Sequence, residues 1–391
     1  MGKTLGQKWL EIFLISTRLG LTSFGGPIAH LGYFHEEYVR RRKWLDEQSY
    51  ADLVALCQFL PGPASSQVGI GIGIVRGGLV GGFISFLGFT LPSVIALVIF
   101  ALALEGLDVS DAGWLQGLKI VAVAVVAHAI WGMAQKLTPD LQRRTIALLA
   151  MSGTLLWQTS LAQVLVILAA GGAGWVLYRS VQETDNTEVI ETVSRKTGAF
   201  CLTLFFILLA LLPLVREWTG STFVAMFDSF YRAGSLVFGG GHVVLPLLER
   251  EFVPTGWMSE ETFLAGYGAA QAVPGPLFTF ASYLGTVLSG WQGALVASAG
   301  IFLPAFLLII GALPFWSMLR KNTHMKGVLT GVNAAVVGIL LAAFYNPIWT
   351  SSITSSLDFI LAAFLFTMLA FWKLPPWIIV VSGAAAGAVL L

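Results

Sequence analysis

Charged residues are scarce in this sequence. Asp, Glu, Lys and Arg make up only 11% of the 391 residues, less than half the share found in a typical soluble domain. The net charge of +1 is too small to suggest a nucleic-acid partner. Cysteine is scarcer still, because Cys57 and Cys201 are the only two and both lie within apolar segments. A soluble domain, a nucleic-acid-binding protein and a disulfide framework are therefore excluded, and the two thiols are interpreted as buried.

Catalytic motifs are missing as well. The sequence has no P-loop, no His-Glu-x-x-His pair and no G-x-S-x-G elbow. The glycine run at 69–74 lacks the final glycine of a dinucleotide-binding fingerprint and lies in an apolar segment, so helix packing explains it better. We therefore expect no enzyme, no cofactor and no metal site. Since ATP hydrolysis is not encoded, any transport must be driven by a proton gradient or by the membrane potential.

Long apolar runs are abundant, because 56% of the residues are hydrophobic. A membrane-spanning helix needs about 20 apolar residues, and such runs recur along the whole chain, which predicts an all-α, polytopic integral membrane protein. The N-terminus, 1–9, lacks the features of a cleaved signal peptide and is expected to be retained. The predicted apolar segments are 9–29, 50–75, 78–104, 114–134, 143–158, 160–179, 199–216, 222–247, 262–288, 291–317, 328–347, 355–371 and 376–391.

A polar stretch divides these segments into a group of six and a group of seven. Residues 180–198 carry acidic and basic side chains among few large apolar ones, which is typical of a solvated linker. We therefore predict an N-terminal membrane repeat at 1–179, a polar linker at 180–198, and a C-terminal membrane repeat at 199–391 with one extra helix at 199–216.

The two groups are copies of one another. The following stretches correspond in the same order: Arg18-Leu19-Gly20 with Arg232-Ala233-Gly234, Phe24-Gly25-Gly26 with Phe238-Gly239-Gly240, Glu37 with Glu251, Trp44 with Trp257, Gln58-Phe59-Leu60-Pro61-Gly62-Pro63 with Gln271-Ala272-Val273-Pro274-Gly275-Pro276, and Pro92 with Pro304. Transporters commonly arise by such duplication.

Segment number and loop charge predict that the second copy is inverted in the membrane. Seven segments, an odd number, separate the two starts. The loop after the third segment is acidic in the first half and basic in the second, as the positive-inside bias requires of inverted copies. The basic clusters at 40–43 and 136–144 share the cytoplasmic side if 9–39 and 50–75 are re-entrant hairpins. Irregular backbone at membrane depth is tolerated only in a cavity or inside protein, so the hairpin tips mark the expected site.

Two breaks interrupt the apolar helices of each half. They are Gly-Gly at 25–26 and 239–240, and Pro-Gly-Pro at 61–63 and 274–276. Such breaks free backbone N–H groups, and those donors, with the positive end of the following helix, suit an anion. Gln58 and Gln271 precede the Pro-Gly-Pro breaks as neutral donors. The alternative is that these residues only permit kinks and close packing; the occurrence of both breaks in both halves favours a site.

Several charged or titratable residues lie near these breaks. Arg18 and Arg232 precede the Gly-Gly breaks and could grip an oxyanion with two parallel N–H groups. Equally, they could snorkel to the interface or pair with Glu37 and Glu251. Lys119 could attract an anion, with Asn333 on the matching helix. His128 is more simply a hydrogen-bonding group between helices, whereas His242, after the second glycine break, is better placed for proton coupling, although its counterpart is Ile28.

The sequence resembles the chromate ion transporter family, long-chain bidomain type. The resemblance covers essentially the whole chain and rests on Leu21-Thr22-Ser23-Phe24-Gly25-Gly26-Pro27 with His30, on the stretch from Gln58 to Pro63 with the glycines to Gly82, and on their second-half counterparts. It implies a bacterial or archaeal inner-membrane protein associated with chromate efflux and resistance, with sulfate as a competing analogue of the same charge and shape.

The prediction is therefore a secondary transporter that exports the chromate dianion across a bacterial cytoplasmic membrane, with the site between the halves near the bilayer midplane. Uptake of sulfate or another anion is the main alternative, and a membrane-embedded enzyme or scaffold is less favoured. Protons are a candidate coupling ion, and a homodimer stays open. The predicted substrate-binding residues are Arg18, Ser23, Gly25, Gly26, Gln58, Gly62, Lys119, Arg232, Gly239, Gly240, His242, Gln271, Gly275 and Asn333.

Overall fold

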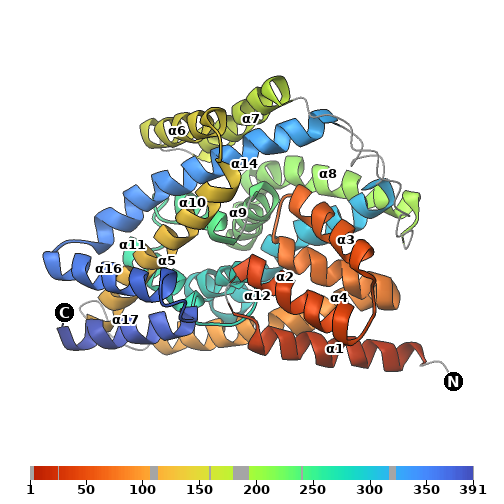
Figure 1. Ribbon diagram of the computed structural model, residues 1–391, viewed down its shortest axis with the longest axis horizontal. Helices are drawn as coiled ribbons and strands as arrows, with labels where there is room; N and C mark the ends of the chain where they lie inside the picture. The colour runs from red at the N-terminus through yellow and green to blue at the C-terminus, as the bar shows by residue number, and fades with distance from the viewer. Residues whose placement is uncertain are drawn as a thin grey trace.

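The computed structural model describes residues 4–24, 26–105, 113–157, 160–178, 193–238, 241–316 and 323–390. All regular structure in these ranges is helical, which confirms the predicted all-α class (Figure 1). The main helices are α1 Leu5–Thr22, α2 Gly26–Phe34, α3 Glu47–Phe59, α4 Ala64–Glu105, α5 Gly113–Leu137, α6 Leu141–Leu156, α7 Ser160–Leu177, α8 Arg195–Thr219, α9 Thr222–Leu236, α10 Val244–Phe252, α11 Glu260–Ala270, α12 Phe280–Ala312, α14 Thr323–Ala343, α16 Ser356–Ala370 and α17 Pro376–Leu390. The described residues also form shorter helical segments, which are η1 His35–Arg41, η2 Gly241–Val243, η3 Leu277–Thr279, η4 Leu313–Phe315, η5 Phe344–Trp349 and α15 Thr350–Ser352.

The first hairpin is formed by α1 and by α2 with η1. The Ser16 hydroxyl lies 3.2 Å from the Tyr38 hydroxyl, and Arg42 pairs with Glu11 at 3.4 Å. In each pair, the midpoint of the sequence between the two partners falls at residues 26 and 27. The chain therefore folds back at the glycine break. The predicted hairpin at 9–39 is therefore present in the structure.

The second hairpin folds back at Pro61-Gly62-Pro63. A side chain placed on Gly71 would contact Leu53, although these residues, nine positions either side of Gly62, would be about 27 Å apart in a continuous helix. Helix α3, at 13 residues, is about 20 Å long, too short to cross the roughly 30 Å apolar core of a bilayer. These dimensions fit the predicted re-entrant hairpin at 50–75.

A sharp turn at Gly77 and Gly78 divides α4 into two antiparallel arms, 64–76 and 79–105. The Ser85 hydroxyl of the second arm donates to the Gly69 carbonyl of the first at 2.8 Å. Gly78 has φ +70°, a conformation that favours glycine. The apolar run at 64–104, long enough by composition to span once, is thus a short arm followed by a long one. This turn lies where the sequence predicts the boundary between two segments.

The second half repeats this design. Helices α9 and α10 fold back at the second glycine break, where Arg232 pairs with Glu251 at 3.0 Å. Helices α11 and α12 fold back at the second Pro-Gly-Pro, where the Tyr283 hydroxyl donates to the Thr262 carbonyl at 3.0 Å. A turn at 289–290 divides α12 into arms 280–288 and 291–312. The internal repeat read from the sequence is thus visible in the fold.

Equivalent side chains begin the equivalent helices. Asp46 caps α3 by accepting from the Ser49 main-chain nitrogen at 2.8 Å, and Ser259 caps α11 by accepting from Thr262 at 3.2 Å. The hydrogen bond from the Ser49 main chain lowers the pKa of Asp46, which lies outside the apolar arms. Caps of this kind satisfy free N–H groups at a helix start and fix where each short helix enters its hairpin.

The two halves exchange their last helices. Helices α6 and α7 of the first half pack on α14 of the second, and α16 and α17 of the second half pack on α5 of the first (Figure 1). The contacts are close, because a side chain on Gly331 would clash with the Ala170 carbonyl and one on Gly117 with the Gly383 carbonyl. Small residues allow this approach between membrane helices. The repeats are thus interlocked.

Helix α8 is the predicted extra helix. It begins at Arg195, where Ser194 accepts from the Thr197 main-chain nitrogen at 3.1 Å, so the end of the predicted linker at 180–198 is already helical. Residues 179–192 lie outside the described ranges. Helix α8 packs along α9 and α12, and the Tyr231 hydroxyl donates to the Phe205 carbonyl at 3.0 Å.

Candidate functional site

The four hairpin tips meet in two crossed pairs. The Gly62 nitrogen donates to the Val237 carbonyl at 2.7 Å, and the Gly275 nitrogen donates to the Ser23 carbonyl at 2.9 Å. In each pair, a Pro-Gly-Pro tip of one half contacts the residue two positions before the glycine break of the other. Gly62 and Gly275 have φ values of +110° and +105°, which glycine adopts far more readily than other residues. We call these two contacts the Gly62–Val237 junction and the Ser23–Gly275 junction.

Both junctions lie beside the middle of a long arm. A side chain on Gly275 would meet the Ser93 hydroxyl at 2.8 Å, and one on Gly62 would meet Ala305 at 3.8 Å. Ser93 is near the centre of arm 79–105, and Ala305 is well inside arm 291–312. If these arms cross the membrane, the junctions lie within its apolar depth, where broken helices mark transporter sites.

A cavity of about 480 Å³ opens beside the Ser23–Gly275 junction. It is built by the first glycine break, by the second-half Pro-Gly-Pro, by η2, by one face of α5, and by the loop between α16 and α17. Its lining residues are Phe24, Gly26, Tyr33, Val125, His128, His242, Ala270, Gln271, Val273, Gly275, Leu277, Leu369, Ala370, Lys373, Leu374, Pro375 and Pro376. Both halves therefore contribute to its wall.

The polar groups of this cavity are mostly hydrogen-bond donors. Lys373 supplies an ammonium group, and the described lining contains no Asp or Glu. The Gln271 amide nitrogen is buried and makes no hydrogen bond of good geometry, although it lies within reach of the Tyr267 hydroxyl. His242 Nδ1 lies 2.7 Å from the Tyr267 hydroxyl, which leaves Nε2 available. A buried donor without a partner is costly, and a ligand oxygen would satisfy it. The site therefore suits an anion.

The loop between α16 and α17 holds Lys373 at the cavity. Lys373 has φ +55°, an uncommon conformation for a lysine, and it ends α16 much as glycine ends many helices. The Leu374 nitrogen donates to the Met368 carbonyl at 3.1 Å, and the Trp372 nitrogen to the Thr367 carbonyl at 3.1 Å. These bonds fix the loop, so the position of Lys373 depends on the packing of α16 and α17 against α5.

Four of the predicted site residues line the cavity, and the others lie elsewhere. Gly26, His242, Gln271 and Gly275 belong to the lining. Ser23 is fully buried and accepts the hydrogen bond from Gly275. Gly62 forms the other junction. The residues outside the lining are Gln58, exposed on α3, Lys119, half-buried on α5, and Asn333, half-buried on α14. Gly25, Gly239 and Gly240 lie outside the described residues.

The two arginines differ from one another, and neither lines the cavity. Arg232 donates to Asp228 and Glu251. This agrees with the alternative considered from the sequence, in which the arginine forms an ion pair with Glu251. Asp228 is fully buried and also pairs with Arg216 at 3.4 Å. Arg18, by contrast, is exposed on α1 and makes no ion pair with any described residue, because Glu37 pairs with Arg42 at 2.6 Å.

Lys373 and Tyr33 are the polar lining residues that sequence reasoning missed, and His128 is one that it assigned to packing. Lys373 lies in a short loop between two apolar segments, where a lysine is ordinary. The only available signal was that 355–391 contains no other basic residue. His128 lines the cavity because its face of α5 turns toward η2 and the tip at Gly275.

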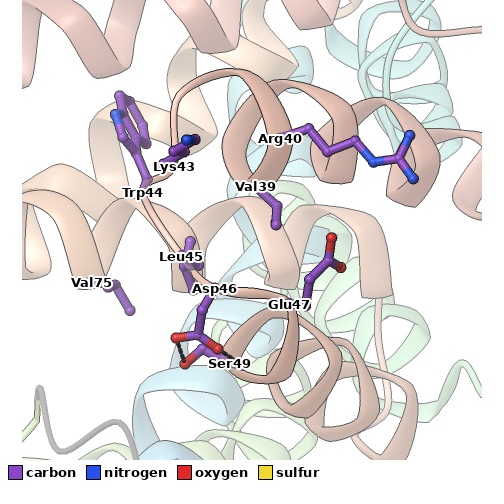
Figure 2. A pocket seen from close by; sticks show the side chains of 9 residues that line it. All are labelled: Val39, Arg40, Lys43, Trp44, Leu45, Asp46, Glu47, Ser49 and Val75. Carbon is purple, nitrogen blue, oxygen red and sulfur yellow. Dashed lines mark hydrogen bonds between the residues drawn. The ribbon is translucent and has the colours of Figure 1, made fainter.

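A larger cavity, about 650 Å³, lies at the base of the first two hairpins (Figure 2). Arg40 and Lys43 line it together with Asp46 and Glu47, so its formal charges cancel. Figure 2 shows the Asp46 carboxylate turned to Ser49, whose hydroxyl donates to it at 2.7 Å. Glu47 is engaged by His35 at 2.6 Å. With its carboxylates present, this cavity suits an anion less well than the one at the Ser23–Gly275 junction.

The fold and the cavity together define the class of the protein. It is a polytopic membrane protein with duplicated halves and broken helices, a design that is typical of secondary transporters. Comparison with known families then identifies the group: the chain belongs to the chromate transporter family, whose model matches residues 10–175 and again 224–388. The resemblance read from the motifs is thereby confirmed, and the double match confirms the repeat.

Similar proteins occur in bacteria and in an archaeon. A probable chromate transport protein of Synechococcus elongatus is 28% identical over 95% of this chain and 93% of its own. A chromate transport protein of Pseudomonas aeruginosa is 27% identical over 84% and 79%, and an uncharacterized transporter of Methanocaldococcus jannaschii is 27% identical over 88% and 85%. No solved structure matches the chain.

Proposed function

We propose that this protein exports chromate across a bacterial cytoplasmic membrane, with the dianion bound in the cavity at the Ser23–Gly275 junction. The observation that carries the proposal is the cavity lining, which includes Lys373 and Gln271 and, among the residues that the structure describes, no Asp or Glu. The names of the bacterial relatives support chromate as the substrate.

The binding geometry follows from the donors. A tetrahedral dianion has four oxygen atoms, and the cavity offers the Lys373 ammonium, the Gln271 amide and the free nitrogen of His242. Ammonium groups and N–H donors form charge-assisted hydrogen bonds with oxyanions, stronger than neutral ones. The main chain at Gly26 starts α2, whose positive end favours an anion. No residue needs to react with the ion, which fits transport.

The two junctions supply a route for alternating access. They are equivalent by the internal repeat, and the cavity lies at the Ser23–Gly275 junction. In an inverted-repeat transporter the two halves rock about the fixed site, so that each junction opens in turn. Opening at the Gly62–Val237 junction would then release the ion on the other side of the membrane. We propose that a proton gradient or the membrane potential drives this cycle.

Sulfate is the alternative substrate, because it has the charge and shape of chromate. None of the cavity donors distinguishes the two ions by hydrogen bonding. Uptake in place of export is the alternative direction, since a gradient can drive a reversible carrier either way. Everted membrane vesicles given chromate and sulfate in competition, with the potential intact or collapsed, separate these cases.

The deciding experiment uses purified protein in proteoliposomes. We expect wild-type protein to move chromate under an imposed gradient or potential. Lys373→Gln should raise KM about tenfold or more, because removal of one charge-assisted contact costs roughly 1.5–3 kcal/mol. Lys326→Gln is the matched control, since Lys326 is exposed on α14 and does not belong to the cavity lining. Wild-type protein that moves neither chromate nor sulfate under any gradient would refute the function. Normal KM in Lys373→Gln would refute the site.

A further inference from the structure

Two histidines line the same cavity. His128 projects from α5 and His242 from η2, and both belong to the lining together with Lys373. Among the described residues, the other titratable groups near them are Tyr33, at the cavity wall, and Tyr267, hydrogen bonded to His242. The described lining contains no Asp or Glu. Lys373 therefore provides the only permanent charge in the described lining, and the two imidazoles provide charge only when protonated.

We propose that His242, assisted by His128, makes the anion site proton-linked, so that the cavity takes up a proton when a dianion binds and releases it when the dianion leaves. Because this proton would move outward together with the exported dianion, one net negative charge crosses the membrane, and of the two driving forces proposed above this inference selects the membrane potential. This inference rests on the proposed function, because it requires an anion in the cavity. It adds the identity of the proton-binding groups, which the family assignment does not supply.

Charge balance is the first argument. A dianion beside Lys373 leaves one negative charge uncompensated in a largely apolar cavity, and uncompensated buried charge is costly. Histidine is the side chain that gains a proton most readily near neutral pH. The described lining contains no carboxylate that could take up the proton instead. An imidazole is therefore the group that can restore neutrality. By linkage, protonation then tightens anion binding to the same extent.

Hydrogen-bond geometry is the second argument. His242 Nδ1 is 2.7 Å from the Tyr267 hydroxyl, which can accept from a protonated ring as well as donate to a neutral one. The imidazolium can thus donate from Nδ1 to Tyr267 and from Nε2 to the anion. His128 and His242 line the same cavity, so protonation of one opposes protonation of the other. We therefore expect about one proton for each dianion.

Calorimetry of the full-length protein tests this inference. Sulfate is the first probe, because it stays a dianion near neutral pH, and chromate is the second, with its own protonation subtracted. Titrations in two buffers of different ionisation enthalpy give the number of protons taken up per anion bound. We expect about one proton and, between pH 6.5 and 8, affinity that falls up to tenfold per pH unit. His128→Gln with His242→Gln should abolish the uptake.

Controls separate the histidines from general effects. His35→Gln changes a histidine outside this cavity, paired with Glu47, and should leave the proton count unchanged. Tyr267→Phe removes the hydroxyl that contacts His242 and leaves the His242 imidazole in place. Proton uptake should therefore persist in this variant. If wild-type protein binds the anion with no proton uptake, or if uptake survives in the double variant, the inference fails and the proposed function stands. If wild-type protein binds neither anion, the proposed function itself fails. The wild-type count remains decisive if the double variant misfolds.

Discussion

The main-chain nitrogen of Gly275 donates a 2.9 Å hydrogen bond to the carbonyl of Ser23. The two residues belong to different halves, and each lies where an apolar helix is broken. The same contact recurs between Gly62 and Val237 at 2.7 Å. The halves are therefore joined at their breaks, and any movement of one half relative to the other must act on these two junctions.

Alanine at Gly275 or Gly62 should impair transport. Both residues have φ above +100°, which costs a side-chain-bearing residue roughly 1–2 kcal/mol, and the Gly275→Ala methyl would press on the Ser93 hydroxyl. We expect a lower Tm and a several-fold loss of anion transport in proteoliposomes. Gly256→Ala is the control, because Gly256 also has positive φ, at +76°, but faces open space. Equal transport losses in all three variants would show that the junctions have no special role.

Arg232→Ala should destabilise the protein, whereas Arg18→Ala should not. Removal of Arg232 leaves Asp228, which is fully buried, with only the 3.4 Å contact to Arg216. Breaking a buried ion pair in this way costs about 3 kcal/mol. Arg18 has no such partner among the described residues. Thermal unfolding in detergent checks the difference, and Arg232→Ala with Asp228→Asn should recover part of the loss. Unchanged Tm in Arg232→Ala would contradict the structural role.

Two neighbouring glycines of α7 should respond oppositely to alanine. A methyl on Gly174 would clash with the Gly327 carbonyl and with Gly331 of α14, whereas one on Gly172 meets nothing within 4 Å. Gly174→Ala should therefore lower Tm by several degrees and reduce the folded yield. Gly172→Ala should be neutral or slightly stabilising, since alanine favours helix over glycine by about 1 kcal/mol. Size-exclusion profiles with thermal unfolding measure both. Equal behaviour would mean that α7 does not pack on α14 as described.

The predicted orientation of the hairpins is tested by labelling. In a background with Cys57→Ser and Cys201→Ser, Arg41→Cys and Arg143→Cys should react with a membrane-impermeant reagent from the same, cytoplasmic side. Lys326→Cys should react from that side too, and Asp108→Cys from the other, because the second copy is predicted to be inverted. Labelling of residues 41 and 143 from opposite sides of the membrane would refute the re-entrant topology. Labelling of residues 108 and 326 from the same side would refute the inversion.

Local sequence was enough to locate the breaks. Glycine adopts backbone conformations that other residues avoid, and proline cannot continue the hydrogen-bonding pattern of a helix, so Gly77 and the Pro-Gly-Pro tips appear where the chain turns. Repetition was enough to pair the halves, because Ser23 and Val237 are equivalent and so are Gly275 and Gly62. The meeting of these four tips is therefore close to what the sequence predicts.

The remaining cavity residues depend on packing between distant segments. Lys373 reaches the cavity only because α16 and α17 rest on α5, and no local pattern encodes that exchange. Arg232 and Arg18 are equivalent in sequence, yet Asp228 stands beside one and Leu14 holds the equivalent place beside the other. A pair of matched arginines thus acquired different surroundings, which symmetry alone could not predict.

The exchange of end helices also sets an order of assembly. Helix α5 is synthesised long before α16 and α17, which cover it, and α6 and α7 before α14. Until the second half has been inserted, the Gly117 face of α5 has no partner. The first half must therefore remain incompletely packed in the membrane until the second half is inserted. The cavity with Lys373 in its wall can form only after both halves have been made.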